Sequence, residues 1–322
     1  MEWLIRYGGR AENVPGYNCS SSDRTNGITN HTLGTASITF GIIGEILYGL
    51  DMMVMVKKKY RSFSCYKIMI ALGICDMSAI FLICILNGYF WMVGANYCTN
   101  PNFMYITGAL ANGFYYGSCM TTVILLVNRL MKLRNKPLML KIFKGDRTYA
   151  VLLIPLSYFL YFCLFTHPVI FNSNNAGWFF YTFSTIHEPK EFYNYPHVVN
   201  NLVMMTVICA LSMWYYRAVS RLSDIGNRLL KWVQKSLFIQ CVVAWTFDIV
   251  VSLAHIYIQF VHKPPYIALM ATIGWQLGHV FPALVYLLFN TTLQRELLLL
   301  FCRGNPAFSD RSYPVASRTF LT

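Results

Sequence analysis

The chain has 322 residues, of which 56% are hydrophobic and only 12% are charged. Soluble domains carry roughly 25% charged residues, so most of the surface of this protein is not expected to face water. The formal net charge of +13 would suggest nucleic-acid binding only if the basic residues gathered on one soluble face. They lie instead in short segments between apolar runs, which argues against nucleic acid and for a lipid bilayer as the partner.

Seven apolar stretches are each long enough to cross a bilayer, which takes about 20 residues of helix. Because lipid offers the backbone no hydrogen-bond partner, each stretch is predicted to be a helix; the alternating pattern of a membrane β-barrel is missing. The sequence therefore predicts an all-α membrane protein, a seven-transmembrane helix bundle over residues 36–290. The predicted helices are 36–56, 68–92, 103–128, 148–171, 197–219, 236–261 and 265–290.

Lysine and arginine are unevenly distributed between the two sides of this bundle. One side holds 21 of the 26, and such residues are retained in the cytosol. We therefore expect the N-terminal segment 1–35 outside the cell and, because the number of helices is odd, the C-terminus in the cytosol. The 21 residues lie in 57–67, 129–147, 217–235 and the tail after residue 290.

Two glycosylation sequons agree with this orientation. Asn18 and Asn30 each begin an Asn-x-Ser/Thr sequence, which is used only outside the cell. A third sequon begins at Asn290, on the expected cytosolic side, and should stay unused.

Of the ten cysteines, only Cys19 and Cys98 fall in segments expected outside the cell, where the compartment is oxidising. Cys98 directly precedes the third predicted helix, and the long loop 172–196 has no cysteine to offer it. We predict a Cys19–Cys98 disulfide that holds the N-terminal segment across the mouth of the bundle. The alternative is two free thiols.

The segment 291–302 follows the last predicted helix and is amphipathic. Its leucines fall mainly on one helical face, with glutamine, arginine and glutamate on another, as in a helix that lies in the membrane interface. Cys302 at its end is a candidate for palmitoylation. The alternative is a frayed end of the seventh helix. The remaining tail, 303–322, is polar and is predicted to be disordered in the cytosol.

Two features of the predicted helices suit a protein that moves. Arg129 lies at the inner end of the third helix, where a cytosolic partner can reach it; alternatively, it only anchors the helix end by snorkelling. Pro282 interrupts the seventh helix and permits a kink.

Catalytic chemistry has little support in the sequence. The HExxH, GxSxG, GxxxxGK[ST] and CxxC motifs are absent. His255 and His279 lie in predicted spans with no carboxylate or cysteine at metal-ligand spacing beside them, so we expect no enzyme activity, cofactor or metal. Asp76 and Asp248 lie within predicted spans and must face the bundle interior, either as ligand or ion contacts or as structural hydrogen-bond partners.

Several short motifs occur in a specific order and spacing. They are Tyr17–Cys19, Ser64–Met69, Leu72–Asp76, Cys98–Pro101, Asn128–Arg129, Pro168–Ser173, Tyr193–His197 with Asn200 and Asn201, and Gly278–Asn290. In these motifs the chain resembles nematode serpentine chemoreceptors, closest to class T, within the seven-helix receptor group. The likeness covers about residues 15–303, nearly the whole chain.

The resemblance implies a chemosensory receptor of the plasma membrane or sensory cilia that signals through a heterotrimeric G protein. Arg129 is then the candidate for G-protein coupling, and a small-molecule ligand is expected in the outer half of the bundle. The rival classes are a ligand-gated channel, whose cytosolic N-terminus disagrees with the loop charges, and a transporter, whose paired broken helices are not seen. Depth and polarity suggest as ligand contacts Asn112, Tyr116, Asp248, His255 and Gln276.

Three departures from the rhodopsin-like pattern limit what the resemblance implies. Asn128 stands where an acidic residue usually precedes the arginine of the third helix. Pro282 and Tyr286 are one residue further apart than usual, and no proline follows Trp245. The activation steps of rhodopsin-like receptors therefore cannot be transferred residue by residue.

Overall fold

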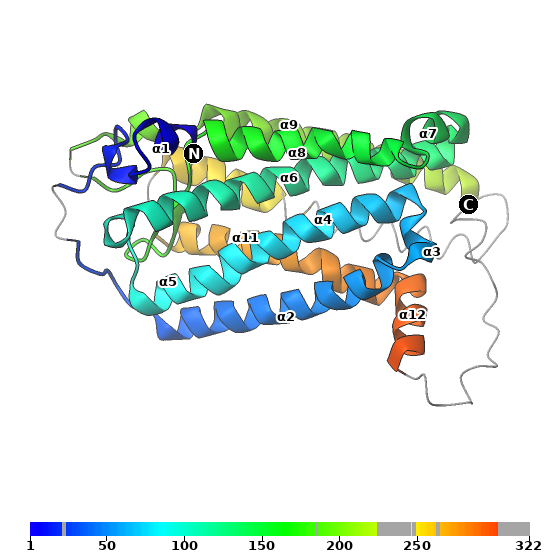
Figure 1. Ribbon diagram of the computed structural model, residues 1–322, viewed down its shortest axis with the longest axis horizontal. Coiled ribbons are helices and arrows are strands. Elements are labelled where there is room, and N and C mark those ends of the chain that lie inside the picture. The colour runs from blue at the N-terminus through cyan, green and yellow to red at the C-terminus, as the bar shows by residue number, and fades with distance from the viewer. Residues whose placement is uncertain (21–23, 185, 224–245, 247–248, 262–264, 302–322) are drawn as a thin grey trace.

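The molecule is an elongated bundle of long helices that lie side by side (Figure 1). The computed structural model describes residues 1–20, 24–184, 186–223, 246, 249–261 and 265–301. Six of the described helical segments are long and apolar enough to cross a membrane. They are α2 (His31–Met55), the continuous α4 (Ser64–Ile80), η2 (Phe81–Leu86) and α5 (Asn87–Val93), α6 (Pro101–Arg134), α8 (Arg147–Phe165), α9 (Tyr195–Ser223) and α11 (Pro265–Phe289).

The sixth predicted span, 236–261, is represented by a shorter apolar helix, Ile249–Phe260. Most of the rest of that span lies outside the described residues, and so do Trp245 and Asp248. The prediction of a helical membrane protein is confirmed by the composition and length of the described helices.

Several helix ends differ from the edges of the predicted apolar runs. The fourth predicted span, 148–171, is wrong at its end, because α8 stops at Phe165 and residues 170–172 form a strand. α2 begins at His31, ahead of the predicted residue 36. The Asn30 side chain accepts a hydrogen bond from the backbone of Leu33 (2.9 Å), which satisfies one of the free donors of the first turn. α6 continues past its predicted end to Arg134, so this helix projects beyond the apolar run.

The second span changes its winding in the middle, where η2 is a stretch of π-helix between α4 and α5. Carbonyl groups of this stretch accept hydrogen bonds from side chains of other helices. Ser37 Oγ of α2 donates to the carbonyl of Cys84 (2.7 Å), and Gln276 Nε2 of α11 donates to the carbonyl of Ile83 (2.7 Å). The π-helical stretch therefore ties three spans together.

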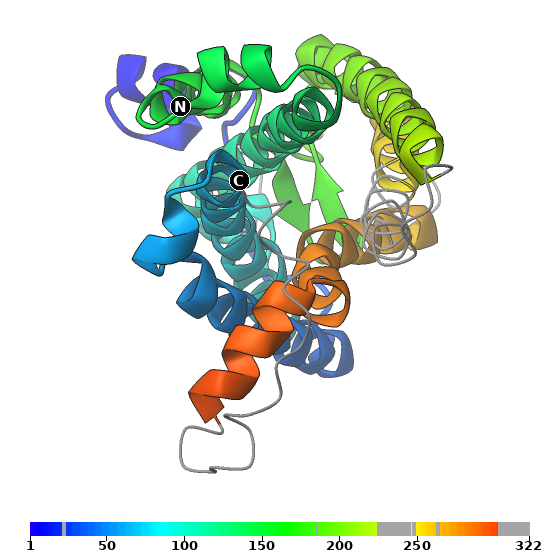
Figure 2. The same cartoon turned by 90° about the vertical axis from the view of Figure 1, so that its right-hand side faces the viewer.

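Short elements close the N-terminal end of the bundle. β1 and β2 pair antiparallel, with Phe171 opposite Trp178, and lie inside the ring of helices (Figure 2). A side chain on Gly108 of α6 would collide with the backbone of Val169, so this glycine lets the hairpin approach α6 closely. The short elements are α1 (Glu2–Arg6), η1 (Ala11–Asn13), η3 (Tyr97–Thr99), β1 (Ile170–Asn172), β2 (Gly177–Phe179) and η4 (Pro189–Phe192).

The N-terminal segment is fastened to this end by a disulfide and by several hydrogen bonds. Cys19 and Cys98 form a disulfide, which is the predicted pairing. The N-terminal ammonium of Met1 donates to the carbonyls of Cys163 (3.0 Å) and Leu164 (2.8 Å) in the last turn of α8, where the helix dipole favours a positive charge.

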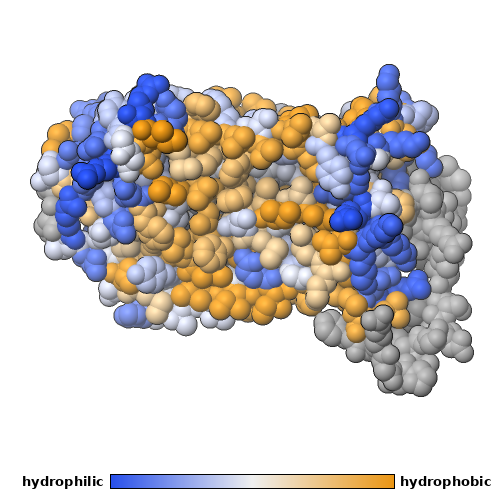
Figure 3. All heavy atoms as spheres, in the orientation of Figure 1, coloured by the Kyte–Doolittle hydropathy of each residue, from blue (hydrophilic) through white to orange (hydrophobic). Residues whose placement is uncertain are grey.

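The opposite end carries α3 (Lys58–Arg61), α7 (Lys136–Phe143) and α12 (Thr291–Phe301); we call it the basic end. Between the two polar ends the surface forms a wide apolar belt (Figure 3). Within the segment 291–302, α12 provides the predicted helix, whereas Cys302 and the tail 303–322 lie outside the described residues. Large side chains exposed along the spans include Ile46, Leu153, Leu156, Val203 and Met213.

Candidate functional site

Asp76 of α4 connects three other helices at the centre of the bundle. Its carboxylate accepts hydrogen bonds from Tyr48 Oη of α2 (2.5 Å), Ser118 Oγ of α6 (2.7 Å) and His279 Nδ1 of α11 (2.8 Å). Asp76 is 3% exposed, and a buried carboxylate is tolerated when it is fully hydrogen-bonded. We call Asp76, Tyr48, Ser118 and His279 the acid network.

The hydrogen bonds of His279 determine which of its ring nitrogens carries the proton. Trp275 Nε1, which can only donate, lies 3.2 Å from His279 Nε2. Nε2 is therefore the acceptor, and Nδ1 is the donor to Asp76. Trp275 also packs edge-on against Trp178 of β2, with ring centroids 6.3 Å apart, so the acid network is connected to the hairpin at the N-terminal end.

A second buried network links α6, α8 and α9. At its centre, His197 Nδ1 lies 2.5 Å from Tyr116 Oη, and His197 Nε2 lies 3.0 Å from Asn201 Nδ2. Because the amide nitrogen can only donate, Nε2 accepts and Nδ1 donates to the tyrosine oxygen. We call this group the amide network. Its members are Tyr115 and Tyr116 of α6, Tyr158 of α8, His197, Asn200 and Asn201 of α9, and Ser252 of the helix Ile249–Phe260.

A cavity of about 50 Å³, the core cavity, lies between the two networks. Asp76, Ser118 and His279 line it from the acid network, and Tyr115 lines it from the amide network. Pro282 also lines it, so the predicted break in the seventh span lies beside the cavity. Ligand pockets usually enclose roughly 300–1,000 Å³, so binding of more than a few atoms here requires the helices to move.

Two of the predicted ligand contacts lie beside this centre. Tyr116 belongs to the amide network, and the ring of His255 packs edge-on against Trp275, with centroids 5.6 Å apart. His255 Nδ1 is 2.9 Å from the carbonyl of Val251, so it acts as a donor there. Asp248 lies outside the described residues.

The other two predicted contacts are engaged in hydrogen bonds within the protein. Asn112, 3% exposed, donates to the carbonyl of His167 (3.1 Å). Gln276, 5% exposed, donates to Ser37 Oγ (2.8 Å) as well as to the π-helical stretch. Both amides brace neighbouring segments in this structure.

His167 lies at the rim of the bundle, between the membrane spans and the N-terminal segment. Its Nδ1 is 3.4 Å from the hydroxyl of Tyr17, and its carbonyl accepts from Asn112 and Asn194. Burial lowers the pKa of His167, and the nearby N-terminal ammonium lowers it further. The imidazole therefore favours its neutral form where the N-terminal segment is docked.

At the basic end, Asn128 and Arg129 have different surroundings. Asn128 is 1% exposed and donates from Nδ2 to Ser64 Oγ of α4 (3.0 Å), so the residue that replaces the usual acid joins two helices. Arg129 is half-buried, and its Nη2 lies 4.0 Å from the sulfur of Met69. The guanidinium thus stands against α4 near the end of the bundle.

α12 is attached to the connection between the first two spans. Glu296 accepts hydrogen bonds from Lys57 Nζ (2.8 Å) and Tyr60 Oη (2.7 Å). Burial raises the pKa of Glu296, but the hydrogen bonds from Lys57 and Tyr60 outweigh burial and hold the pKa below its usual value.

A comparison with known families identifies the class of this bundle. The model of the serpentine type 7TM GPCR chemoreceptor Srt family matches residues 4–308. The chain belongs to the Srt family. No curated protein matches it. Srt membership confirms the resemblance to class T serpentine receptors and makes this chain a member of a receptor family rather than of an enzyme family.

The sequence motifs of this Srt chain include part of the polar centre without indicating its contacts. His197, Asn200 and Asn201 stand in one motif, and Asp76 in another. Their partners are far away along the chain. Tyr116 is 81 positions from His197, and His279 is 203 positions from Asp76; Tyr115 bonds to Asn201 from the same helix as Tyr116. Clustering of polar residues inside apolar runs was the available signal; the pairing required the packed bundle.

Proposed function

We propose that this Srt-family chain is a G-protein-coupled chemosensory receptor of the plasma membrane. It binds a small molecule beside the core cavity and signals through a heterotrimeric G protein at the basic end. The observation that carries the proposal is the position of this cavity between the acid and amide networks. A ligand there would contact groups from four spans and would favour whichever packing of the helices binds it better.

The proposed orientation places the N-terminal end outside the cell. Lysine and arginine are retained in the cytosol, and the segments 57–67 and 129–147, which are rich in them, lie at the basic end. The Cys19–Cys98 disulfide belongs to the opposite end, as expected for an oxidising compartment. In this orientation α12 lies at the inner membrane surface as an interfacial helix.

The proposed coupling residue is Arg129. It lies at the same end of the bundle as α3 and α7, and α6 extends from it to Arg134. Asn128 joins α6 to α4 instead of holding the guanidinium as an acid would. The pair that an acid at position 128 would form with Arg129 is therefore replaced by a contact between α6 and α4.

The test is a signalling assay in cells that express the chain together with reporter G proteins. Volatile and soluble compounds are screened with calcium and cyclic-nucleotide readouts. We expect Tyr116→Phe and His255→Ala to weaken the response to an active compound by about tenfold or more. Each removes a hydrogen-bonding group beside the core cavity, since Tyr116 and His255 pack against its lining residues Tyr115 and Trp275. Arg129→Ala should reach the cell surface and signal weakly.

Leu153→Ala is the matched control because Leu153 is exposed on the apolar belt of α8. It should respond as the native chain does. Normal signalling by Arg129→Ala would reject its coupling role, and an ion current without G-protein activation would favour the channel class instead.

A further inference from the structure

A second, smaller cavity lies nearer the N-terminal end, beneath the chain that follows β2. Its volume is about 20 Å³, and we call it the outer cavity. No lysine, arginine, aspartate or glutamate occurs among its lining residues in the described part of the chain. The lining is mostly aromatic or aliphatic, and its polar groups include Trp178, His255 and Gln259.

Gln259 is the unusual residue of this cavity. It is 6% exposed, and neither its amide nitrogen nor its amide oxygen has a hydrogen-bond partner among the residues that the structure describes. Within the same described part of the chain, the indole nitrogen of Trp178, which is 2% exposed, also lacks a partner. Leaving a buried donor or acceptor unsatisfied costs about 1–3 kcal/mol, so these groups gain most from a molecule that enters the cavity.

The same residue type elsewhere in the bundle shows what a structural glutamine looks like. Gln276 is 5% exposed, almost the same as Gln259. Its amide nitrogen donates to Ser37 Oγ and to the carbonyl of Ile83. Gln259 therefore differs from Gln276 in pairing and not in burial.

We propose that the outer cavity is a ligand subsite, in which Gln259 and Trp178 bind the polar group of an uncharged small molecule. This inference rests on the proposed receptor function and adds the class of ligand. The unpaired N–H groups of Trp178 and Gln259 select a carbonyl or hydroxyl oxygen, and the amide oxygen of Gln259 can accept from a hydroxyl. A carboxylate or an ammonium group would be buried without an opposite charge in the described lining, which is strongly unfavourable.

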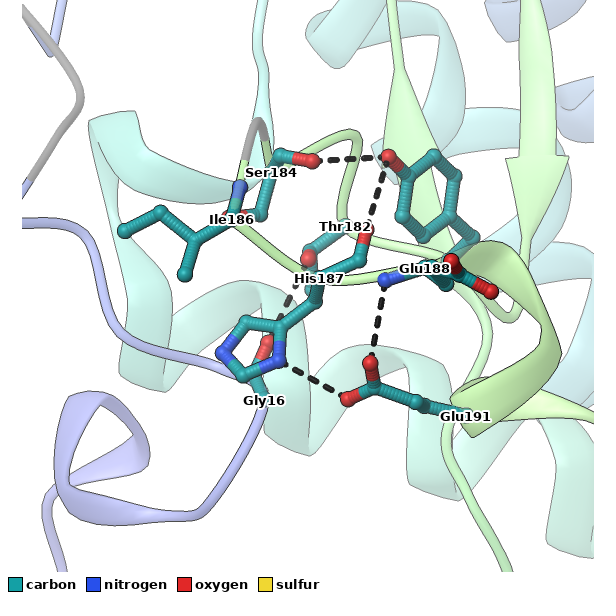
Figure 4. A network of polar contacts seen from close by, with 8 residues as sticks. Gly16, Thr182, Ser184, Ile186, His187, Glu188 and Glu191 are labelled. Carbon is teal, nitrogen blue, oxygen red and sulfur yellow. Dashed lines mark hydrogen bonds and ion pairs between the residues drawn. The ribbon is translucent and has the colours of Figure 1, made fainter.

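The outer cavity admits only a water-sized group as it stands, so the rest of the ligand requires the covering chain to move. The described residues 181–184 and 186–192, which we call the covering loop, form polar contacts within the loop and a long hydrogen bond to the N-terminal segment (Figure 4). Thr182 Oγ1 donates to the carbonyl of Gly16 (3.4 Å), and His187 Nδ1 lies 2.8 Å from Glu191 Oε2. Phe183 has a φ of +58°, a strained value for a bulky residue, so displacement of this loop would also release strain.

The first experiment compares Gln259→Met with Gln276→Met in the purified full-length chain, without added compound. Both substitutions replace a buried amide by an apolar side chain of similar length. We expect Gln276→Met to lower the thermal midpoint because Ser37 and the Ile83 carbonyl lose a donor. Gln259→Met should leave the midpoint unchanged or raise it. An equal fall in both variants would show that a structural water already satisfies Gln259 and would overturn the proposal.

The second experiment measures binding as a rise in thermal midpoint with straight-chain ketones, alcohols, alkanoic acids and alkyl amines of matched length. Ketones or alcohols should stabilise the native chain, and Gln259→Met and Trp178→Phe should raise the half-saturating concentration by about tenfold or more. The proposal is overturned if acids or amines alone stabilise the chain, if no ketone or alcohol does, or if both variants bind as the native chain does.

A G-protein activation assay on the same variants separates this inference from the proposed function. Binding that depends on Gln259 without any G-protein activation would remove the signalling role and leave the subsite intact. Activation that is unchanged in Gln259→Met and Trp178→Phe would remove the subsite and leave the receptor function intact.

Discussion

Asp76 shows how one buried side chain can determine the packing of four spans. Its carboxylate accepts from Tyr48, Ser118 and His279, and hydrogen bonds to a charged group contribute about 1.5–3 kcal/mol each. In Asp76→Asn one carboxylate oxygen is replaced by an amide nitrogen, which cannot accept a hydrogen bond. We therefore expect a marked fall in the thermal midpoint of the purified receptor and a smaller fall in Ser118→Ala, which removes only one donor. An unchanged midpoint in Asp76→Asn would show that the network does not hold the helices.

His167 predicts a pH dependence at the rim of the bundle. Burial and the N-terminal ammonium lower its pKa in the folded chain. Below the ordinary histidine value of about 6.5, the unfolded chain binds a proton that folded His167 resists, so stability falls as the pH drops from there toward the lowered folded-state pKa. Above about pH 6.5 His167 is neutral in both the folded and the unfolded chain, so it does not make the stability depend on pH there.

The measurement for His167 is the thermal midpoint of the purified chain across roughly pH 5–8. His167→Gln should flatten the acid side of this curve. His31→Gln is the matched control, because His31 is exposed at the start of α2, and it should leave the curve as it is. Equal slopes in the native chain and in His167→Gln would refute the assignment.

The limits of sequence reasoning are clearest for single polar residues. The pattern placed Gln276 and His255 inside apolar runs, and their depth and polarity suggested that both contact ligand. In the structure Gln276 donates to Ser37, 239 positions away, whereas the amide of Gln259 has no partner among the described residues. Because the partner of a buried amide comes from another helix, no local pattern distinguishes a structural glutamine from one available to a ligand.

At the scale of helices and strands, apolar length predicted the spans but not the residues at which each helix begins and ends. Six spans follow from runs of apolar residues, whereas the start of α2 depends on the cap at Asn30. The hairpin of β1 and β2 was not predicted. Its strands have three residues each and all are buried, so they show no alternation; packing against α6 and α11 holds them in place.

The attachment of α12 is a prediction at this scale. Glu296 accepts hydrogen bonds from Lys57 and Tyr60. Because its pKa is lowered in the folded chain, the ionised carboxylate stabilises the attachment of α12 at neutral pH, and this stabilisation is lost as the pH falls through the folded-state pKa. We expect Glu296→Gln to weaken the attachment and to speed hydrogen exchange of the α12 amides. Lys57→Gln should have a similar effect, and the double variant should add little.

Arg295→Gln is the control for this prediction, since Arg295 is exposed on the same helix. Exchange in α12 should be unaffected there. If Glu296→Gln exchanged no faster than Arg295→Gln, the buried face of α12, with Leu293 and Leu297, would be sufficient to hold the helix.

At the scale of the whole molecule, the apolar belt and the two polar ends describe a membrane protein, but a bundle of this shape can be inserted either way up. Orientation rests on the charge asymmetry of the loops, 21 basic residues of 26 on one side. The sequons provide an independent chemical test, because they mark both ends. Asn18 is exposed at the N-terminal end, whereas Asn290 caps α12 at the basic end.

We expect enzymatic deglycosylation to increase the electrophoretic mobility of the native chain expressed in animal cells. The shift should shrink or disappear in Asn18→Gln, because an exposed sequon at the outer end can accept a glycan, and it should persist in Asn290→Gln. Asn30 is the weaker glycan acceptor of the outer pair, since its side-chain oxygen caps α2 where that helix begins.

A shift that survives Asn18→Gln combined with Asn30→Gln and vanishes in Asn290→Gln would place the basic end outside the cell. Arg129 would then be out of reach of any cytosolic partner, so the same gel tests both the topology and the coupling that depends on it.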